Sequence, residues 1–357
     1  MPSKSNPRRS DFEVGILAAL ALEAQAARGI FDEIYDDETE NASAGEDGRA
    51  TRDTNSYTKG RIGRHEAVLA HIPGMGKVNA ANAASSFLSS FTELKLVLLV
   101  GICGGVPHGP NGVEIMLGDV IIGKNVIQSD FGRQFPDGFV RKNSVDDNLG
   151  KQGPRIRSFI TKLESCKQNL EETMSLKLQS LLRKPEFEPL KYPGSSEDKL
   201  FLPDYVHKHY NAQTCECSQD GKICSIAKQS SCEELGCSSA CLEARKRRQD
   251  QPSIHFGSIA SGDAVIKSGQ HRDKIAHREG VIAIEMEGAG IWEYLPCIVV
   301  KGVCDYADSH KNKEWQRYTA AAASAGARAI LEQWEATDRP RESGMVSVFP
   351  QLIKLQN

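Results

Sequence analysis

The sequence predicts an α/β fold in which seven or more strands form one central sheet flanked by helices. Short runs of mostly aliphatic and β-branched residues, such as residues 94–100 and 298–303, are typical of strands that are buried on both faces. Stretches with helical periodicity lie between such runs, and residues 155–183 form the longest of them. Because strands that alternate with helices build a sheet with helices packed on its faces, we expect a three-layer fold.

The N-terminal half supplies the first strands of this sheet. Residues 14–20 form a buried strand, and the helix that follows carries Glu23 in its first turn. An acid at this place either complements the helix dipole or lies beyond a strand end for a functional reason. Residues 57–72 form a hairpin-like pair, and residues 94–100 form the most hydrophobic strand. This strand is expected to end at Gly101, where three glycines in five residues permit close backbone approach.

The C-terminal half continues the alternation. A further strand begins near residues 118–122, and residues 155–183 are expected to form one long amphipathic helix. Strand-like order returns at residues 254–263, after a stretch that lacks hydrophobic periodicity. A last helix is expected over residues 313–335.

Two strands near the C-terminus end abruptly in acidic residues. Residues 281–284 are followed by Glu285 and Glu287, and residues 298–303 are followed by Asp305. In open α/β sheets, ligands bind beyond the carboxyl ends of the strands. Carboxylates that follow two strands in the same way are therefore better candidates for chemistry than for solvation of the strand ends.

The sequence predicts one large domain with an insertion. Residues 1–11 are expected to form a disordered tail, and residues 337–357 a peripheral one. The domain between them, residues 12–336, contains a polar surface loop at residues 36–56 and a Cys-rich insertion at about residues 185–252.

Composition excludes several classes of protein. The 357 residues are 39% hydrophobic and 25% charged, which is ordinary for a globular protein, and the net charge is −3. A slightly negative net charge does not favour binding to nucleic acid or to an anionic membrane. No run approaches the ~20 apolar residues of a membrane span, and the first residues lack the apolar core of a signal peptide. We therefore expect a cytoplasmic protein that binds a small molecule. The basic run at residues 245–248 is also compatible with a nuclear location.

Taken together, the motifs resemble the nucleoside phosphorylase and nucleosidase superfamily. The similarity is greatest to methylthioadenosine/S-adenosylhomocysteine nucleosidases and to fungal purine nucleosidase domains. It lies in the order of the motifs along residues 12–335, outside the loop and the insertion. The motifs are Glu23, Gly101 to Gly105, Gly118-Asp119, Ser261-Gly262-Asp263, Glu285-Met286-Glu287 and Cys304-Asp305-Tyr306-Ala307-Asp308. The resemblance implies a nucleoside phosphorylase-like fold with a mixed central sheet.

The resemblance also implies roles for individual residues. Glu23 would position and activate the attacking water, Glu287 would hold the ribose hydroxyls, Met286 would pack under the sugar, and Asp305 would protonate the purine N7. The other implied substrate contacts come from Glu285, Gly104, Cys103, Val265, Ile266 and Ser261. The chemistry agrees, because cleavage of a purine N-glycosidic bond passes through a ribosyl cation and needs an acid for the leaving base.

Two departures limit what the resemblance implies. A serine that touches the ribose in bacterial nucleosidases falls at Ile102, and their base-stacking aromatic residue falls at Val265. The phosphorylase branch carries a Gly-Asp-Pro-x-Arg phosphate loop near its first strand, whereas residues 19–23 read Ala-Leu-Ala-Leu-Glu. A carboxylate in place of an arginine favours water over phosphate as the nucleophile.

Six of the ten cysteines lie in residues 215–241. Thiolates at short spacing can bind zinc, but none of these cysteines has the C-x2-C spacing of common zinc ribbons. A structural zinc, disulfides and an unliganded flexible insertion are the alternatives, and the spacing favours the last. His207 and His209 are expected to be surface residues, and no metal is assigned.

The sequence therefore predicts a purine nucleosidase that hydrolyses an adenosine-, inosine- or guanosine-like nucleoside to free base and ribose without a cofactor. The alternatives are a purine nucleoside phosphorylase, an ATP- or AMP-type nucleotide nucleosidase, and a module that senses a nucleoside without turning it over. The resemblance implies a homo-oligomer, a dimer or larger. Neither nucleic acid nor a membrane is expected as a partner.

Overall fold

The structure is a computed structural model that describes residues 7–35, 49–211, 215–219, 222–245 and 251–335. Most of the predicted N-terminal tail and loop, and the predicted C-terminal tail, lie outside these residues. The part of the tail that is described contains a turn of 3-10 helix at Arg9–Asp11. Within the described residues, no helix combines the length and apolarity that crossing a membrane requires.

The predicted central sheet is present and has nine strands in the order β10-β9-β6-β11-β5-β1-β4-β3-β2. The bounds of its strands are β1 Val14–Ala18, β2 Glu33–Ile34, β3 Ser56–Ile62, β4 His65–His71, β5 Leu96–Gly105, β6 Val120–Gln128, β9 Ile254–Ser261, β10 Val281–Glu285 and β11 Cys297–Asp305. The sheet is mixed, because β5 is parallel to β1 and β11 whereas β6 is antiparallel to β11. A separate hairpin consists of β7 Gly132–Phe135 and β8 Gly138–Arg141.

One half of the sheet closes on itself. Besides pairing with β1 and β11, β5 pairs at its end with β10, where Gly104 lies opposite Ile284 and Gly105 opposite Ala283. The strands β5, β11, β6, β9 and β10 therefore form a closed ring. This closure brings the ends of β5, β10 and β11 to one place, although β10 and β11 share no hydrogen bonds in the described ladders.

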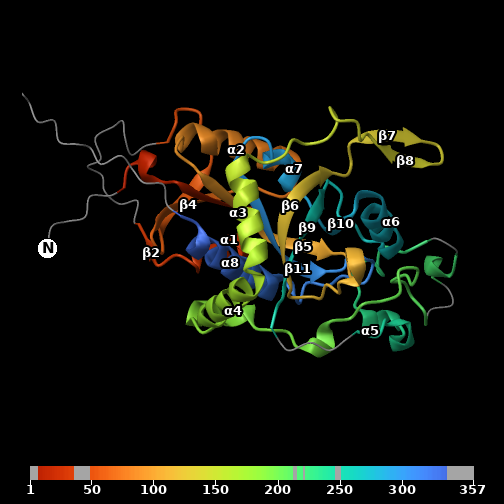
Figure 1. Ribbon diagram of the computed structural model, residues 1–357. Coiled ribbons are helices and arrows are strands. Elements are labelled where there is room, and N and C mark those ends of the chain that lie inside the picture. The colour runs from red at the N-terminus through yellow and green to blue at the C-terminus, as the bar shows by residue number, and fades with distance from the viewer. Residues whose placement is uncertain (1–6, 36–48, 212–214, 220–221, 246–250, 336–357) are drawn as a thin grey trace, which may run out of the picture.

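Helices cover both faces of the sheet and give the three layers that the sequence predicts (Figure 1). Their bounds are α1 Ala21–Arg28, α2 Lys77–Ser90, α3 Pro154–Ser165, α4 Lys167–Leu182, α5 Cys232–Leu235, α6 Gly269–Glu279, α7 Gly288–Ile291 and α8 Gln316–Gln333. The helices α1, α4 and α8 pack on one face, and α2 and α7 pack together on the other. The strand β1 is buried on both faces, with Ile16 in one core cluster and Leu17 in the other.

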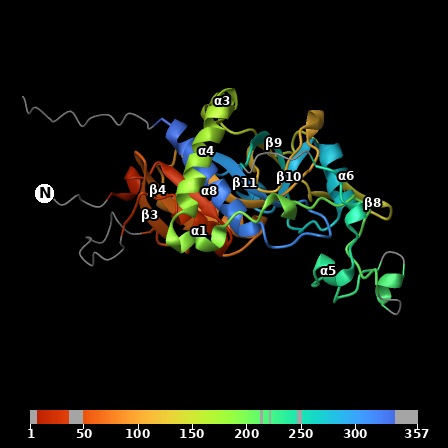
Figure 2. The same cartoon turned by 90° about the horizontal axis from the view of Figure 1, so that it is seen from below.

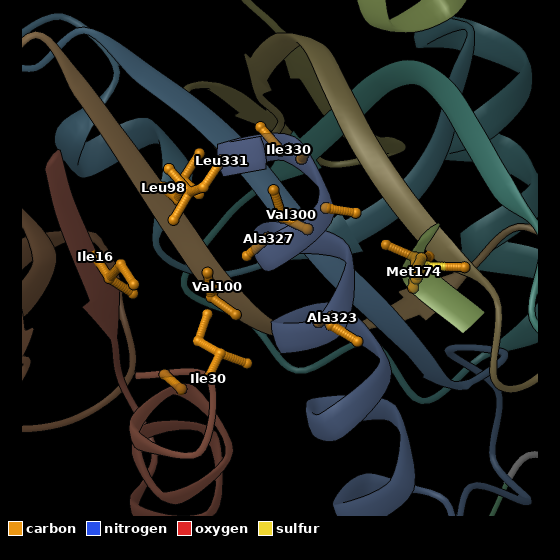
Figure 3. Packing of buried hydrophobic residues seen from close by; sticks show 14 of the residues in the cluster. Ile16, Ile30, Leu98, Val100, Met174, Val300, Ala323, Ala327, Ile330 and Leu331 are labelled. Atoms are coloured by element: carbon orange, nitrogen blue, oxygen red, sulfur yellow. The ribbon is translucent and has the colours of Figure 1, made fainter. Parts of the chain in front are cut away.

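The C-terminal helix α8 forms the centre of the larger core cluster. Figure 3 shows Leu331 of this helix beside Leu98 on β5, and Ala327 beside Val300 on β11. Small side chains let the helix approach the sheet closely. A Cβ atom added at Gly302 of β11, for example, would lie 2.2 Å from the carbonyl oxygen of Thr319.

Two predicted elements differ from those observed. The strand expected to end at Gly101 continues to Gly105, because the glycines take part in the ladder with β11 and β10. The single helix expected over residues 155–183 is two helices, α3 and α4, which meet at Cys166. Cys166 has a ψ of 31°, which is outside the helical range, and it therefore separates the two helices. The hydrophobic periodicity of the sequence continues across this break and does not reveal it.

Candidate active site

A cavity of about 200 Å³ lies where the ends of β5, β10 and β11 meet. The structure brings almost all of the predicted site residues to its wall, namely Glu23, Cys103, Gly104, Val265, Ile266, Glu285, Met286, Glu287 and Asp305. Ser261 differs from these. It is fully buried and not among the cavity-lining residues, and its hydroxyl accepts a hydrogen bond from the Ala289 N–H. Its place is behind Glu285, where it supports the start of α7 rather than the cavity wall.

Glu23 is held rigidly by backbone donors at the N-terminus of α1. Its Oε2 atom accepts hydrogen bonds from the N–H groups of Ala19 at 3.0 Å and Leu20 at 2.8 Å, and Oε1 accepts one from Ile102 at 2.8 Å. A carboxylate has about four acceptor positions, so three donors leave room for one more, such as a water molecule. Burial raises the pKa of Glu23 above its ordinary value; Lys301 opposes this shift, and Glu287 adds to it.

The glycine at position 101 is required by this arrangement. A Cβ atom there would lie 2.3 Å from Oε1 of Glu23, so any side chain would displace the carboxylate. The sequence predicts that these glycines let another group approach the backbone closely. At Gly101 that group is the carboxylate of Glu23.

Glu285 and Glu287 share one buried ammonium group, that of Lys301. The Lys301 Nζ atom lies 2.9 Å from Oε2 of Glu287 and 3.5 Å from Oε2 of Glu285. Burial alone would lower the pKa of Lys301, but Glu287, Glu285 and Glu23 raise it above its ordinary value, so the side chain stays charged. The three carboxylates exceed the one ammonium, which leaves an excess of negative charge beside the cavity whenever all three are ionised.

Glu285 itself faces the backbone more than the cavity. Its two oxygens accept hydrogen bonds from the N–H groups of Glu287 and Gly288, each at 3.0 Å. These contacts fix the turn between β10 and α7 on which Met286 and Glu287 are carried. Burial raises the pKa of Glu285, against the effect of Lys301.

Asp305 ends β11 and is fixed by the turn that follows. Its Oδ1 atom accepts a hydrogen bond from the Ala307 N–H at 2.8 Å, and its Oδ2 atom lies 3.0 Å from Nζ of Lys311. Ala307 adopts a φ of 51°, a left-handed conformation that is uncommon for residues other than glycine. Such strain is often found at functional sites, and here it turns the chain so that its N–H group meets Asp305.

Cys103 also lines the cavity. Burial raises the pKa of its thiol, so Cys103 remains protonated and contributes apolar surface rather than a nucleophile.

Sequence reasoning missed two lysines of this site. A lysine inside the otherwise apolar strand at Lys301 is a signal that could have identified the first, because an unpaired buried ammonium would be costly. Lys311 lies in a polar loop with several other charged residues, and nothing in the sequence distinguishes it from them. Among the described residues that line the cavity, Lys311 is the one basic side chain.

A larger cavity of about 690 Å³ adjoins the first, and the two share Cys304, Asp305 and Lys311. Residues of the Cys-rich insertion, including His207 and Cys232, line it together with Asp308 and His310. His207 is buried, so its predicted surface position is wrong.

Comparison with known proteins relates this arrangement to other chains. The model of the phosphorylase superfamily matches residues 13–333. A nucleotide-binding leucine-rich repeat (NLR)-like protein of Hyaloscypha variabilis is 31% identical over 333 residues, which are 90% of this chain and 29% of that protein. The chain thus spans less than a third of the length of this relative.

More distant similarities connect the chain to smaller proteins. A 5'-methylthioadenosine/S-adenosylhomocysteine nucleosidase of Mycobacterium bovis is 23% identical over 280 residues, which are 77% of this chain and 83% of that one. The crystal structure of the nucleosidase of the same name from Neisseria meningitidis, in complex with methylthio-immucillin-A, shares the fold. Its TM-score is 0.52 and its identity 16%, over 90% of this chain and 99% of that chain.

The family match covers the whole sheet, the helices on both faces and every strand end that lines the cavity. It runs from residue 13 to residue 333. The chain belongs to the phosphorylase superfamily.

Proposed function

We propose that this domain is a purine nucleosidase, which hydrolyses the N-glycosidic bond of a purine nucleoside to free base and ribose. The observation that carries the proposal is the distribution of carboxylates along one cavity. Glu23, Glu287 and Asp305 all line it; Glu23 and Glu287 interact with Lys301, whereas Asp305 pairs with Lys311. Nucleosidase activity in two relatives supports the reaction class.

The reaction requires a group that stabilises positive charge on the sugar. As the bond from C1′ to the base nitrogen breaks, its electrons leave with the base and the ribosyl group becomes cationic. Fixed charges aimed at such a transition state act strongly in a site that excludes water. Glu287 suits this role, because its carboxylate is buried, lines the cavity and belongs to a group of carboxylates that outnumber their ammonium partner.

The reaction also requires a nucleophile and an acid. Water held by Glu23 would attack C1′ and give its proton to that carboxylate, while Asp305 would supply a proton to the leaving purine. Glu23 is suited to the first task by its three backbone donors and its remaining acceptor position. Met286, Val265 and Ile266 provide the apolar surface that the sugar and the base would contact.

Water rather than phosphate is the expected nucleophile. Phosphate recognition commonly relies on arginine or on several cations, whereas Lys311 is the one basic residue on the described cavity wall and is already paired with Asp305. We expect turnover of a purine nucleoside to yield free ribose at a rate that does not depend on added phosphate. Chromatography of the products, with and without phosphate, measures this. Formation of ribose 1-phosphate that requires phosphate would establish a phosphorylase instead.

The pH dependence should reflect the environment of Glu23. To accept a proton from water, Glu23 must be ionised, and its raised pKa keeps it protonated to a higher pH than an ordinary glutamate. We therefore expect kcat/KM to fall on the acidic side with a midpoint above the ordinary value of 4.5. The profile is measured across the acidic range, with circular dichroism at each pH to verify folding.

Glu285→Gln provides the control, because Glu285 also has a raised pKa but would not act as the base. This variant should keep the acidic limb. An acidic limb at or below the ordinary glutamate value in the parent protein, or its disappearance in Glu285→Gln, would remove Glu23 from the proposed role.

The identity of the substrate beyond its purine base needs a direct assay. Five lysines and five carboxylates are among the described residues that line the larger cavity, so its charge neither favours nor disfavours a phosphorylated substrate. A panel of nucleosides and nucleotides, analysed for release of free base, therefore includes both classes. Binding without release of base would identify a sensing module. Self-association and a cytoplasmic location remain predictions.

A further inference from the structure

The Cys-rich insertion between α4 and β9 has very little apolar core of its own. Its buried cluster consists of Cys217, Cys224, Ala227 and Leu235, and half of these residues are cysteines. Figure 2 shows α5 and the segments beside it projecting away from the central sheet. Small units of this kind generally need disulfides or a metal ion in addition to hydrophobic burial. In the described residues all ten cysteines are free thiols, so disulfides do not supply the missing stabilisation.

Three of these thiols surround a single imidazole nitrogen. The Sγ atoms of Cys215, Cys217 and Cys224 lie 3.4, 3.6 and 3.5 Å from Nδ1 of His209. One imidazole nitrogen makes one hydrogen bond, so hydrogen bonding cannot account for three sulfur atoms at this distance. A tetrahedral zinc ion with Zn–S and Zn–N bonds of about 2.3 and 2.0 Å places its sulfur and nitrogen ligands about 3.5 Å apart. The spacing in this cluster is that of a Cys3His site.

The backbone supports the same interpretation. The N–H of Cys224 donates to Sγ of Cys217 at 3.4 Å, and the N–H of Ala227 donates to Sγ of Cys224 at 3.3 Å. Hydrogen bonds from backbone amides to sulfur stabilise thiolates, the form in which cysteine binds a metal.

A second cluster is formed around His207, two residues before His209 in the same segment. The Nδ1 atom of His207 lies 3.6 Å from Sγ of Cys232 and 3.6 Å from Sγ of Cys237. His310 joins His207 and Cys237 in a set of three whose ligand atoms all lie within 4.8 Å of one another, and Cys232 lies beside this set through its contact with His207. The Nε2 atom of His207 lies 2.9 Å from the Ser230 carbonyl oxygen, to which it donates, so the lone pair is on Nδ1, which faces the cysteines.

His310 provides independent support. Its side chain is buried, and neither ring nitrogen has a hydrogen-bond partner among the described residues. A buried imidazole without any partner is destabilising, and such a group in a folded protein calls for a missing ion or water. Its ring stacks on Phe201 at 3.9 Å, which fixes its orientation beside His207.

We propose that the insertion binds two zinc ions, one through His209, Cys215, Cys217 and Cys224, and the other through His207, Cys232, Cys237 and His310. Thiolate and imidazole ligands in sets of four are typical of structural zinc. His207 and His209 are separated by a bend at Lys208, and their Nδ1 atoms face different cysteines, Cys232 for His207 and Cys215 for His209. The ligand His310 lies far away in the sequence. For both reasons the cysteine spacing alone favoured an unliganded insertion.

The second site would connect the insertion to the candidate active site. His310 follows Asp305 by five residues on the loop after β11, and it lines the larger cavity together with His207 and Cys232. A zinc ion bound there would therefore fix one wall of the cavity next to Asp305. The first site has no such connection, because its four ligands all come from the insertion. This consequence rests on the proposed function, whereas metal binding itself does not.

Metal content of the purified full chain tests the proposal without any enzyme assay. Mass spectrometry of the metals should find two zinc ions per chain. Cys224→Ser should lower this to one by removing a ligand of the first site, and Cys237→Ser should lower it to one at the second. Cys241→Ser, in the same insertion but in neither cluster, is the matched control and should retain two.

The remaining outcomes are also decisive. A folded parent protein without zinc, or one whose cysteines are found as disulfides by thiol titration, would overturn both sites. Two zinc ions in Cys237→Ser, or one in Cys241→Ser, would overturn the second ligand set. If the variants do not fold, cobalt is exchanged into the parent protein. Visible absorption of tetrahedral cobalt with thiolate charge-transfer bands is expected, and its absence would contradict the proposal.

Discussion

Glu287→Gln should lower kcat on a purine nucleoside by a factor on the order of 10² to 10³, the loss typical for one electrostatic group in a preorganised site. The substitution keeps the size of the side chain and its acceptor oxygen but removes the charge that would stabilise the ribosyl cation. Because this interaction exists mainly in the transition state, kcat and kcat/KM should fall together. Steady-state kinetics on the released base measures both.

Stability should change much less than turnover. Glu287 is 2.9 Å from Lys301, and breaking a buried ion pair is usually costly, but Lys301 keeps Glu285 at 3.5 Å as a second partner. Glu293→Gln is the matched control, since Glu293 is exposed on the turn after α7 and its contact with the Gly150 N–H survives in the amide. Near-normal kcat in a folded Glu287→Gln protein would remove this residue from the mechanism. A loss of activity matched by a large fall in the melting temperature would indicate a structural role.

The fold could be predicted largely from hydrophobic periodicity. Runs such as those of β1 and β11 are buried on both faces, and their β-branched residues identify them as strands without further information. The predicted strand and helix ends were wrong where the local sequence does not determine where the element ends. The glycines at the end of β5 looked like a terminus, yet tertiary pairing with β10 keeps them in the sheet. At Cys166 the apolar pattern continues although the helix ends there and a second one begins.

The sequence identifies the acids that the structure brings to the wall of one cavity, but it does not show how they come together. Glu23, Glu287 and Asp305 follow strands, and the rule for strand ends selects them. That rule does not by itself bring them together, because β10 runs antiparallel to β5; the closure of the sheet does. Lys311 and His310 depend on the path of one loop after β11, and no periodicity encodes such a path.

The loop after β11 offers two acids for the leaving base. Asp305 lines both cavities, whereas Asp308 is among the residues lining only the larger one. Burial raises the pKa of Asp308 to about 6, so part of it is protonated near neutral pH. Asp305 has the better position, because it faces the cavity that contains Glu23 and Glu287. Substituting Asp305 and Asp308 separately shows whether the better placed acid or the more readily protonated one supplies the proton.

Asp305→Asn should lose activity on ordinary purine nucleosides by a factor on the order of 10² to 10⁴, the usual contribution of a general acid. The amide oxygen can still accept from the Ala307 N–H, so the turn should persist, but the amide cannot deliver a proton and places a second donor before Lys311. On a nitrophenyl riboside, provided that it is accepted, the loss should be much smaller, since that leaving group needs no protonation. Rates on the two substrates, compared as a ratio, measure the effect.

Asp308→Asn is the control for this ratio, because it makes the same chemical change three residues away, on the same loop. If Asp305 is the acid, Asp308→Asn should affect both substrates similarly and leave the ratio close to that of the parent protein. If Asp305→Asn loses equal activity on both substrates while it still folds and binds the product base, Asp305 does not protonate the leaving group. A ratio that changes in Asp308→Asn instead would identify Asp308 as the acid, which its raised pKa would then explain.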